Sequence, residues 1–213
     1  MTRSQKKGNR WADHYTRRAQ KENFPARSVY KLQEIQKKQP VIGPGDRVLD
    51  LGCAPGSWLL YAAQLIGAKG QVVGVDLKPV TQALPENVHV RQQDAFALCD
   101  PDSDQSDGRF HVVLSDMAPD TTGSKHVDAA RSAGLSEAAL AVACRVLVPG
   151  GNFVCKIFQG PDFKAFTEAV RAEFSAMKIF KPQSSRKASR EIFVIGLGKK
   201  QEAVCQDTAN GRP

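Results

Sequence analysis

Short apolar runs, rich in β-branched and aromatic residues, recur along the chain from residue 46 onward and alternate with stretches that fit helices. The strand-like runs cover residues 46–51, 71–76, 88–91, 110–115, 152–158 and 191–197, with a weaker one at 176–180. The helix-like stretches cover residues 57–67, 134–147 and 161–174. Nearly continuous apolar strands separated by helices are typical of a parallel sheet that helices cover. The sequence therefore predicts an α/β fold with a mostly parallel sheet.

The first 40 residues have a different character and form a separate segment in our prediction. Residues 1–12 are expected to be disordered, residues 13–23 are polar and fit a helix, and a second helix capped by Ser28 extends to about Gln39. Pro40 and the glycines after it close this segment. We divide the chain into a basic N-terminal arm and helix (1–40), a main domain (41–198) and a flexible tail (199–213), and interpret 100–108 as an acidic surface loop.

The positive charge of the chain is concentrated in the N-terminal arm. Residues 1–40 contain 11 Lys/Arg and 3 Asp/Glu, whereas residues 41–213 contain 19 of each. The arm also carries the aromatic residues Trp11, Tyr15, Phe24 and Tyr30. A second basic cluster begins within the weaker strand and contains Lys178, Lys181, Arg186, Lys187 and Arg190. Cations interleaved with aromatic rings suit phosphate contact and base stacking. The arm is therefore predicted to contact nucleic acid.

Composition excludes several other classes of protein. The length of 213 residues and the 41% hydrophobic content suit one well-filled domain. No apolar run approaches the roughly 20 residues of a membrane-spanning helix, and no signal peptide is recognisable. The five cysteines and four histidines lack the spacing of a zinc site. We expect a cytoplasmic monomer with reduced thiols, no disulfide and no metal.

Acidic residues stand at the ends of the first four predicted strands. In a parallel sheet these ends share one edge, where ligands bind near the point at which the strand order reverses. The acids are Asp50, Asp76, Asp94 and Asp116, and the loop after the first strand contains Gly52, Pro55, Gly56 and Trp58. Glycines allow this loop to turn tightly and to approach a ligand closely. We predict that these eight residues bind a cofactor.

The type of cofactor follows from the loop. Asp76 alone would also suit the ribose of NAD. However, the loop lacks the G-x-G-x-x-G pattern, and Pro55 removes a backbone N–H that a pyrophosphate would need. Carboxylates match the ammonium and ribose groups of S-adenosyl-L-methionine, which is therefore the predicted cofactor.

Lys156 lies inside an otherwise apolar strand, between Cys155 and Ile157. A lysine in such a position is costly unless it is paired or functional. A lysine that extends from the strand end to solvent is the structural alternative. Because the strand ends at the same edge as the four acids, we interpret Lys156 as a catalytic candidate.

Five segments of the chain resemble the FtsJ/RrmJ-type, or heat-shock, ribosomal RNA large-subunit 2′-O-methyltransferase family. They are RSVYKLQEI, VLDLGCAPGSW, SDMAPD, VPGGNFVCKIFQG and SSRKASREIF, and the similarity covers about Arg27 to Lys199. Two positions depart from the family pattern. Ser57 stands where many members have a second glycine, and Asp120 where many have Asn.

The resemblance implies a Rossmann-like methyltransferase fold, a seven-stranded mostly parallel sheet with helices on both faces. It implies a catalytic tetrad of Lys31, Asp116, Lys156 and Glu191, and cofactor contacts at Gly56, Trp58, Asp76, Asp94 and Asp116. It also implies that the substrate is a uridine of 23S rRNA in the large ribosomal subunit.

The chemistry can also be argued from the residues. Methyl transfer from a sulfonium is an in-line displacement, so positioning supplies much of the acceleration, and the attacking hydroxyl benefits from a group that receives its proton. We assign Lys156 as a general base or as a group that orients the hydroxyl, with Asp116 orienting its ammonium and Glu191 positioning Lys31.

The loop 116–119 lacks the Asn/Asp-Pro-Pro-aromatic motif of amino-methylating enzymes. Strand alternation places Cys155, a candidate nucleophile for cytosine methylation, on the opposite face.

Two alternative functions remain open from the sequence. A tRNA or mRNA-cap ribose 2′-O-methyltransferase would use the same tetrad. A non-catalytic RNA-binding protein of ribosome assembly would keep the fold, although the intact tetrad and acid set argue against this reading.

Overall fold

The structure, a computed structural model, describes residues 10–99, 109–186 and 188–201. Its elements in chain order are α1 (Arg10–Lys21), α2 (Val29–Lys38), β1 (Arg47–Leu51), α3 (Ser57–Ile66), β2 (Gln71–Asp76), β3 (Val88–Gln92), a 3₁₀ turn (Ala95–Cys99), β4 (Phe110–Ser115), α4 (Lys125–Val146), β5 (Leu147–Phe158), α5 (Phe163–Glu173), β6 (Phe174–Phe180) and β7 (Glu191–Lys199). Seven strands form one sheet in the order β3-β2-β1-β4-β5-β7-β6. β7 is antiparallel to β5 and β6, and the other strand pairs are parallel. The predicted α/β fold with a mostly parallel sheet is confirmed.

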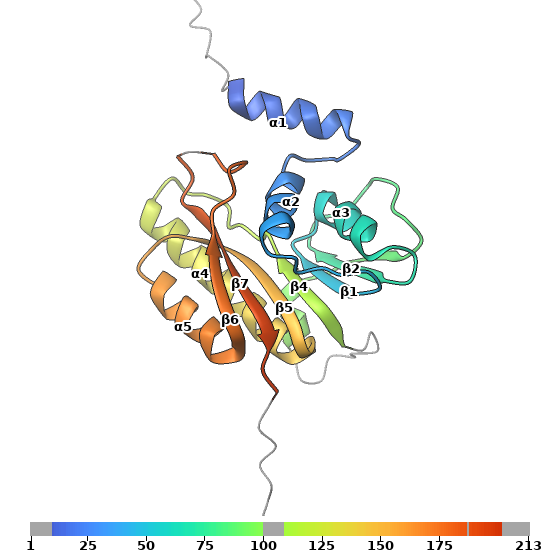
Figure 1. Cartoon of the computed structure of the whole chain (residues 1–213). Coiled ribbons are helices and arrows are strands. Elements are labelled where there is room, and N and C mark those ends of the chain that lie inside the picture. The colour runs from blue at the N-terminus through green and yellow to red at the C-terminus, as the bar shows by residue number, and fades with distance from the viewer. Residues whose placement is uncertain (1–9, 100–108, 187, 202–213) are drawn as a thin grey trace, which may run out of the picture.

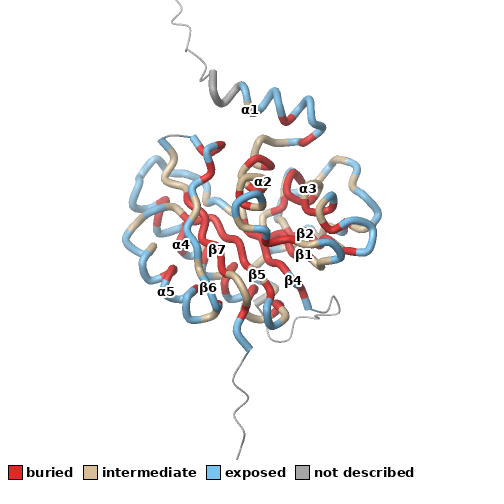
Figure 2. The backbone as a smooth tube through the Cα atoms, in the orientation of Figure 1, coloured by how far each residue is buried: buried red, intermediate tan, exposed pale blue. Residues whose placement is uncertain are grey.

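Helices cover both faces of the sheet and create two apolar cores (Figure 1). α2 and α3 pack on one face, where Leu32 and Leu59 meet strand residues such as Val154. α4 and α5 pack on the other face, where Leu140 and Phe166 belong to the second cluster. The buried central strands form the red middle layer of Figure 2. This arrangement explains the nearly continuous apolar runs, because strands buried on both faces have no polar side.

The side chains of β5 alternate between these two cores. Phe153, Cys155 and Ile157 lie in the cluster with α4 and α5, whereas Val154 lies in the cluster with α2 and α3. Lys156 shares the parity of Val154 and is 5% exposed. Cys155 therefore lies on the opposite face from Lys156, as strand alternation predicted.

The N-terminal region contains a helix that begins earlier than predicted. Residues 10–12 are helical in α1, so the expected disorder of residues 1–12 is wrong for this part, and the rest of that segment lies outside the described residues. Ala19 and Phe24 pack with Val29 and Tyr30 in a small separate cluster. α1 itself lies beyond α2, away from the sheet, in Figure 1.

Several element boundaries also differ from the prediction. α4 begins at Lys125, before the predicted residue 134. The prediction began too late because the first turns of the helix bury small residues such as Ala129 and Ser132, which do not form the apolar pattern that indicates a helix in a sequence. β5 begins at Leu147, before the predicted residue 152. Ser28 precedes α2 as expected, but its side chain makes no capping hydrogen bond. The predicted acidic loop 100–108 and the tail after residue 201 lie outside the described residues.

Candidate active site

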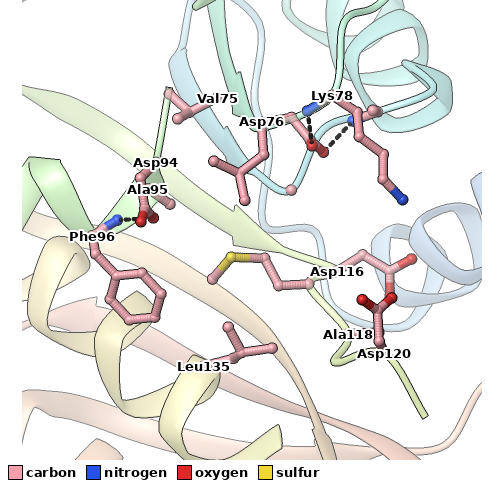
Figure 3. Close-up of a pocket in the computed structure, with 14 residues that line it drawn as sticks. Val75, Asp76, Lys78, Asp94, Ala95, Phe96, Asp116, Ala118, Asp120 and Leu135 are labelled. Carbon is pink, nitrogen blue, oxygen red and sulfur yellow. Dashed lines mark hydrogen bonds between the residues drawn. The ribbon is translucent and has the colours of Figure 1, made fainter. Parts of the chain in front are cut away.

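A cavity of about 390 Å³ opens at the carboxyl ends of β1, β2, β3 and β4 (Figure 3). Gly52, Asp76, Asp94 and Asp116 line it, one from the end of each strand. β1 and β4 are neighbours in the sheet. The strands continue as β2 and β3 on the side of β1, and as β5, β7 and β6 on the side of β4. The cavity therefore lies where the strand order reverses its direction. Ligands bind at this position in open α/β sheets.

Asp76 and Asp94 are held in the cavity wall by backbone donors. Asp76 accepts hydrogen bonds from the backbone N–H groups of Ala54 (2.9 Å) and Lys78 (2.8 Å), and Asp94 accepts one from Phe96 (2.9 Å). Figure 3 shows all three bonds as dashed lines. Each carboxylate oxygen can accept more than one hydrogen bond, so both groups keep acceptor capacity for a ligand.

The loop after β1 requires its glycines. Gly52 has φ +76°, and a Cβ there would lie 2.6 Å from Cγ of Met117, on the loop after β4. Gly56 has φ +105°, and a Cβ there would lie 2.9 Å from Nε2 of Gln82. Both positions therefore combine a left-handed backbone with close neighbours, which only glycine tolerates without strain.

Asp50 lies beneath the cavity rather than in its wall. The residue is 1% exposed, and neither carboxylate oxygen has a hydrogen-bond partner. Burial, followed by the nearby Asp116 and Asp76 carboxylates, raises the pKa of Asp50 well above its usual value. Three carboxyl groups thus gather around one edge of the sheet, which makes a cationic ligand favourable there.

Lys156 and Asp116 form the centre of the second part of the site. Nζ of Lys156 lies 3.0 Å from Oδ1 of Asp116 and also donates to the Asp116 backbone carbonyl. Lys156 comes from β5 and Asp116 from the loop immediately after β4, its neighbour in the sheet. Ser136 of α4 donates to the Lys156 backbone carbonyl (3.0 Å), which fixes the strand where the lysine leaves it.

Lys31 and Glu191 complete the group from two distant segments. Nζ of Lys31, on α2, lies 3.5 Å from Oδ1 of Asp116 and donates to Oε2 of Glu191 at 3.1 Å. Ser185 donates to the other oxygen, Oε1 of Glu191, at 2.6 Å. The structure therefore brings the four tetrad residues together in one chain of contacts from Lys156 through Asp116 and Lys31 to Glu191.

The electrostatics of the group keep Lys31 and Asp116 charged. Burial lowers the pKa of Lys31, but the Asp116 and Glu191 carboxylates outweigh it and hold the pKa above its usual value. Burial likewise raises the pKa of Asp116, but Lys156 and Lys31 outweigh it and hold the pKa below its usual value. Lys31 is thus a fixed cation that neither donates nor accepts a proton near neutral pH.

Not all predicted cofactor residues face the cavity. Trp58 is buried: its ring centroid lies 5.9 Å from that of Phe193, and its Nε1 donates to the Ser28 carbonyl (2.9 Å). Pro55 is exposed on the loop, and Gly56 is buried at the start of α3. Of the eight predicted residues, Gly52, Asp76, Asp94 and Asp116 line the cavity.

Two residues that join the segments of the site were missed. Ser57, noted only as a departure from the family pattern, accepts from the Ala26 N–H (2.8 Å) and donates to the Ala26 carbonyl (3.0 Å). Glu34, one turn after Lys31, accepts from the N–H groups of Gln183 (2.6 Å) and Ser184 (2.8 Å). Both are single polar side chains whose partners are remote in sequence, so no local pattern signals them.

The chain is similar to known proteins over most of its length. The family model described as FtsJ-like methyltransferase matches residues 24–199. The chain belongs to the FtsJ-like methyltransferase family. It is 58% identical to the Ribosomal RNA large subunit methyltransferase E of Desulforapulum autotrophicum over 198 residues, which cover 93% of this chain and 98% of the relative. The protein of the same name from Desulfatibacillum aliphaticivorans is also 58% identical over 199 residues, 93% of this chain and 96% of the relative.

A solved structure supports the fold of this FtsJ-like methyltransferase. The crystal structure of a ribosomal RNA methyltransferase from Plasmodium falciparum superposes with a TM-score of 0.71, covering 83% of this chain and 98% of that one. Its sequence is 22% identical, so the likeness concerns the fold alone. The Rossmann-like methyltransferase fold implied by the resemblance is thereby confirmed.

The described part of this chain has neither a membrane-spanning helix nor a cluster of metal ligands. Within residues 10–99, 109–186 and 188–201, no helix has the length and apolar character needed to cross a bilayer. The same ranges contain no cluster of three or more His, Cys, Asp or Glu residues suited to a metal ion. Cys53, Cys144 and Cys155 form no disulfide, and the side chains of the other two cysteines lie outside the described part.

Proposed function

We propose that this FtsJ-like methyltransferase transfers a methyl group from S-adenosylmethionine to a ribose 2′-hydroxyl, on a uridine of 23S rRNA in the large ribosomal subunit. One observation carries the proposal: the buried Lys156 and the partly buried Lys31 meet on Asp116, which also lines the acid-walled cavity. The printed name of the two bacterial relatives supports the choice of ribosomal RNA.

The residues of the cavity fit S-adenosylmethionine. Asp50 is an unpartnered buried acid whose charge a nearby ammonium or sulfonium would stabilise. Asp76 has the position and free acceptor capacity for ribose hydroxyls, and Asp94, beside the half-exposed ring of Phe96, suits an adenine that donates through its amino group. When bound, the cofactor supplies an electrophilic methyl group.

The tetrad acts on the hydroxyl that accepts this methyl. Asp116 fixes the Nζ of Lys156 at the edge of the cavity, so an incoming 2′-hydroxyl meets Lys156 next to the cofactor site. Asp116 and Glu191 hold Lys31 as a cation. We assign the hydroxyl to Lys156 because its Nζ lies nearer to Asp116, which lines the cavity. Glu191 and Ser185 hold Lys31 in place. Positioned groups that take up or guide a proton accelerate such reactions by roughly 10²- to 10⁴-fold.

Methylation of a cytosine ring carbon fits the site less well. That reaction needs a thiolate nucleophile. Cys155 is fully buried on the face away from Lys156, and burial raises the pKa of its thiol to about 12. A thiol in this environment is an inert core residue.

The proposal is tested with Lys156→Ala, measured separately for cofactor affinity and for methyl transfer to large-subunit rRNA. We expect transfer to fall at least 100-fold while cofactor affinity stays within a factor of a few. Lys164→Ala, an exposed lysine of α5, is the matched control. Transfer near the wild-type rate would remove Lys156 from the chemistry, and lost cofactor binding would give it a structural role.

Parallel assays with tRNA and capped RNA test the alternative substrates, because labelling of tRNA alone would overturn the ribosomal assignment.

The N-terminal arm contributes to RNA binding in this proposal. Its cations and α1 precede α2, the helix that carries Lys31. Deleting the arm before about residue 25 should weaken RNA binding and flatten its dependence on salt, because fewer phosphates are neutralised. Cofactor affinity should change little. Unaltered RNA affinity at several salt concentrations would show that the arm does not bind RNA.

A further inference from the structure

A second cavity, of about 290 Å³, is lined by Lys31 and shares no lining residue with the acid-walled cavity. Its wall is built from the start of α2 and the loop between β6 and β7. Arg27 and Lys31 contribute from the first segment, and Arg186, Ser189 and Glu191 from the second. We call this the Arg27–Arg186 pocket. It shares Lys31 and Glu191 with the tetrad, so its occupant would lie directly beside the reacting group.

The charges of the Arg27–Arg186 pocket favour an anion. Burial and then the nearby Arg186 lower the pKa of Arg27, so the two guanidinium groups repel each other across the pocket. Glu191 is the acid in the wall, but its oxygens already accept from Lys31 and Ser185. The pocket also lies at the beginning of α2, which has no acid in its first turn. A helix N-terminus adds a favourable field for an anion.

The loop that carries Arg186 is held in place before any ligand arrives. Glu34 accepts from the backbone N–H groups of Gln183 and Ser184, just ahead of Arg186. On the other side of Arg186 in the sequence, the Ser189 carbonyl accepts a hydrogen bond from the Lys181 side chain at 2.9 Å. Arg27 is fixed from the other side, because the neighbouring Ala26 and Ser28 backbones bond to Ser57 and Trp58 of α3. Preorganised donors bind an anion at a lower entropic cost.

The chemistry of RNA identifies the anion. In a polynucleotide, the carbon that bears the 2′-hydroxyl is bonded to the carbon that bears the 3′-phosphate. When the 2′-hydroxyl reaches Lys156, that phosphodiester must lie a few ångströms away, on the side not taken by the cofactor. Arginine is suited to it, because its planar fork binds two phosphate oxygens at once.

We propose that the Arg27–Arg186 pocket binds the phosphodiester on the 3′ side of the methylated ribose, with the two arginines sharing one phosphate. The inference rests on the proposed function and adds a binding site to it. The shared phosphate neutralises the repulsion between the two guanidinium groups and fixes the rotation of the ribose toward Lys156. The pocket thereby distinguishes a nucleotide inside an RNA chain from a free nucleoside.

The test compares Arg27→Gln, Arg186→Gln and the double variant with Arg171→Gln, an arginine on α5 remote from both cavities. Affinity for large-subunit rRNA is measured at several salt concentrations, and methyl transfer and cofactor affinity are measured beside it. Each single variant should weaken RNA binding roughly tenfold to a hundredfold, as expected for a lost charge-assisted hydrogen bond. The slope of log affinity against log salt should fall by about 0.7. Cofactor affinity should not change.

The double variant tests whether one phosphate is shared. Two groups that bind the same phosphate are coupled, so the double variant should lose clearly less than the product of the single losses. Independent, multiplying losses would mean separate phosphates and would overturn the inference. The inference would also be overturned if the Arg27 and Arg186 variants bound RNA as tightly as Arg171→Gln, while the wild-type protein methylates a 2′-hydroxyl. If the wild type itself does not, the proposed function fails instead.

A modified RNA repeats the test without altering the protein. A synthetic RNA spanning the methylated site is made with a neutral methylphosphonate at the 3′ linkage of the target, and a control RNA carries it at a distant linkage. We expect the first RNA to bind the wild-type protein less tightly than the control and to bind Arg186→Gln no worse than the control. Equal binding of both RNAs to the wild type would contradict the proposal.

Discussion

The two halves of the site are built in different ways. On the cofactor side, Asp76 and Asp94 are fixed by backbone N–H groups of residues near the same strand ends. On the acceptor side, four residues are fixed mainly by one another: Lys31 of α2, Asp116 of the loop after β4, Lys156 of β5 and Glu191 of β7. The first half therefore depends on local backbone geometry, and the second on tertiary packing between distant segments.

This difference predicts how each half responds to substitution. A carboxylate anchored to the backbone can be altered without moving its neighbours, so changes on the cofactor side should be local. Removing one member of a mutually paired group leaves the others unpaired in a buried environment, so changes on the acceptor side should spread.

Asp116→Asn should have the largest effect, because Asp116 belongs to both halves. It removes the partner of the buried Lys156 and of the partly buried Lys31, and breaking a buried pair costs about 3–5 kcal/mol of folding free energy. Denaturant unfolding should show that loss, and methyl transfer should fall at least 100-fold. Asp162→Asn, which changes an exposed acid just before α5 that lines neither cavity, is the control. A variant of Asp116 with wild-type stability would mean that the lysines do not depend on it.

Glu34→Ala should lower kcat roughly tenfold while leaving cofactor affinity unchanged, since it frees the loop that carries Ser185 and Arg186. Glu34→Gln keeps one acceptor oxygen and should recover part of the rate. Glu137→Ala, an exposed acid of α4, provides the comparison. A loss of cofactor affinity equal to the loss of kcat would place Glu34 in the general stability of the fold, without a specific role on the acceptor side.

Asp50→Asn should separate stability from cofactor binding. Because the folded-state pKa of Asp50 is raised, ionisation of this acid destabilises the protein once the pH exceeds the ordinary carboxyl pKa of about 3.9. The amide cannot ionise, so the ligand-free variant should melt at a higher temperature than the wild type at pH 7. Its affinity for S-adenosylmethionine should be several-fold weaker. Equal melting temperatures together with unchanged affinity would contradict the assigned role of Asp50.

The pH dependence of stability should show the smallest effect. Because the pKa of Asp116 is lowered in the folded state, its ionisation adds to the free energy of unfolding. This contribution is complete at a pH above the ordinary carboxyl range and is lost as the pH falls through the folded-state pKa. The raised pKa of Lys31 gives stability that is full below the ordinary lysine pKa of about 10.4 and is lost as the pH rises through its folded-state value. Unfolding free energies of the wild type and of Lys31→Met should therefore differ by a constant amount between about pH 5 and pH 10 and converge above it. A difference that disappears near pH 8 would contradict this.

The same contrast explains what the sequence could predict. The strands and the acids at their ends are local signals, so the fold and the cavity acids Asp76, Asp94 and Asp116 followed from periodicity and strand ends. Lys31 and Glu191 came from the resemblance to a family, because a lysine on a helix and an acid before a strand are ordinary in isolation. Glu34 and Ser57 were missed because their partners lie far away in the chain. The early start of α4 was missed because its buried residues there are small.

In the proposed function, the tetrad acts on a ribose hydroxyl of large-subunit rRNA. The most direct measurement incubates the wild-type protein with labelled S-adenosylmethionine and large ribosomal subunits, digests the RNA to nucleosides and identifies the labelled product. We expect a single labelled nucleoside, 2′-O-methyluridine, and at least 100-fold less label in a parallel reaction with Lys156→Ala. A methyl group on a base nitrogen or ring carbon, or equal labelling by Lys156→Ala, would contradict it.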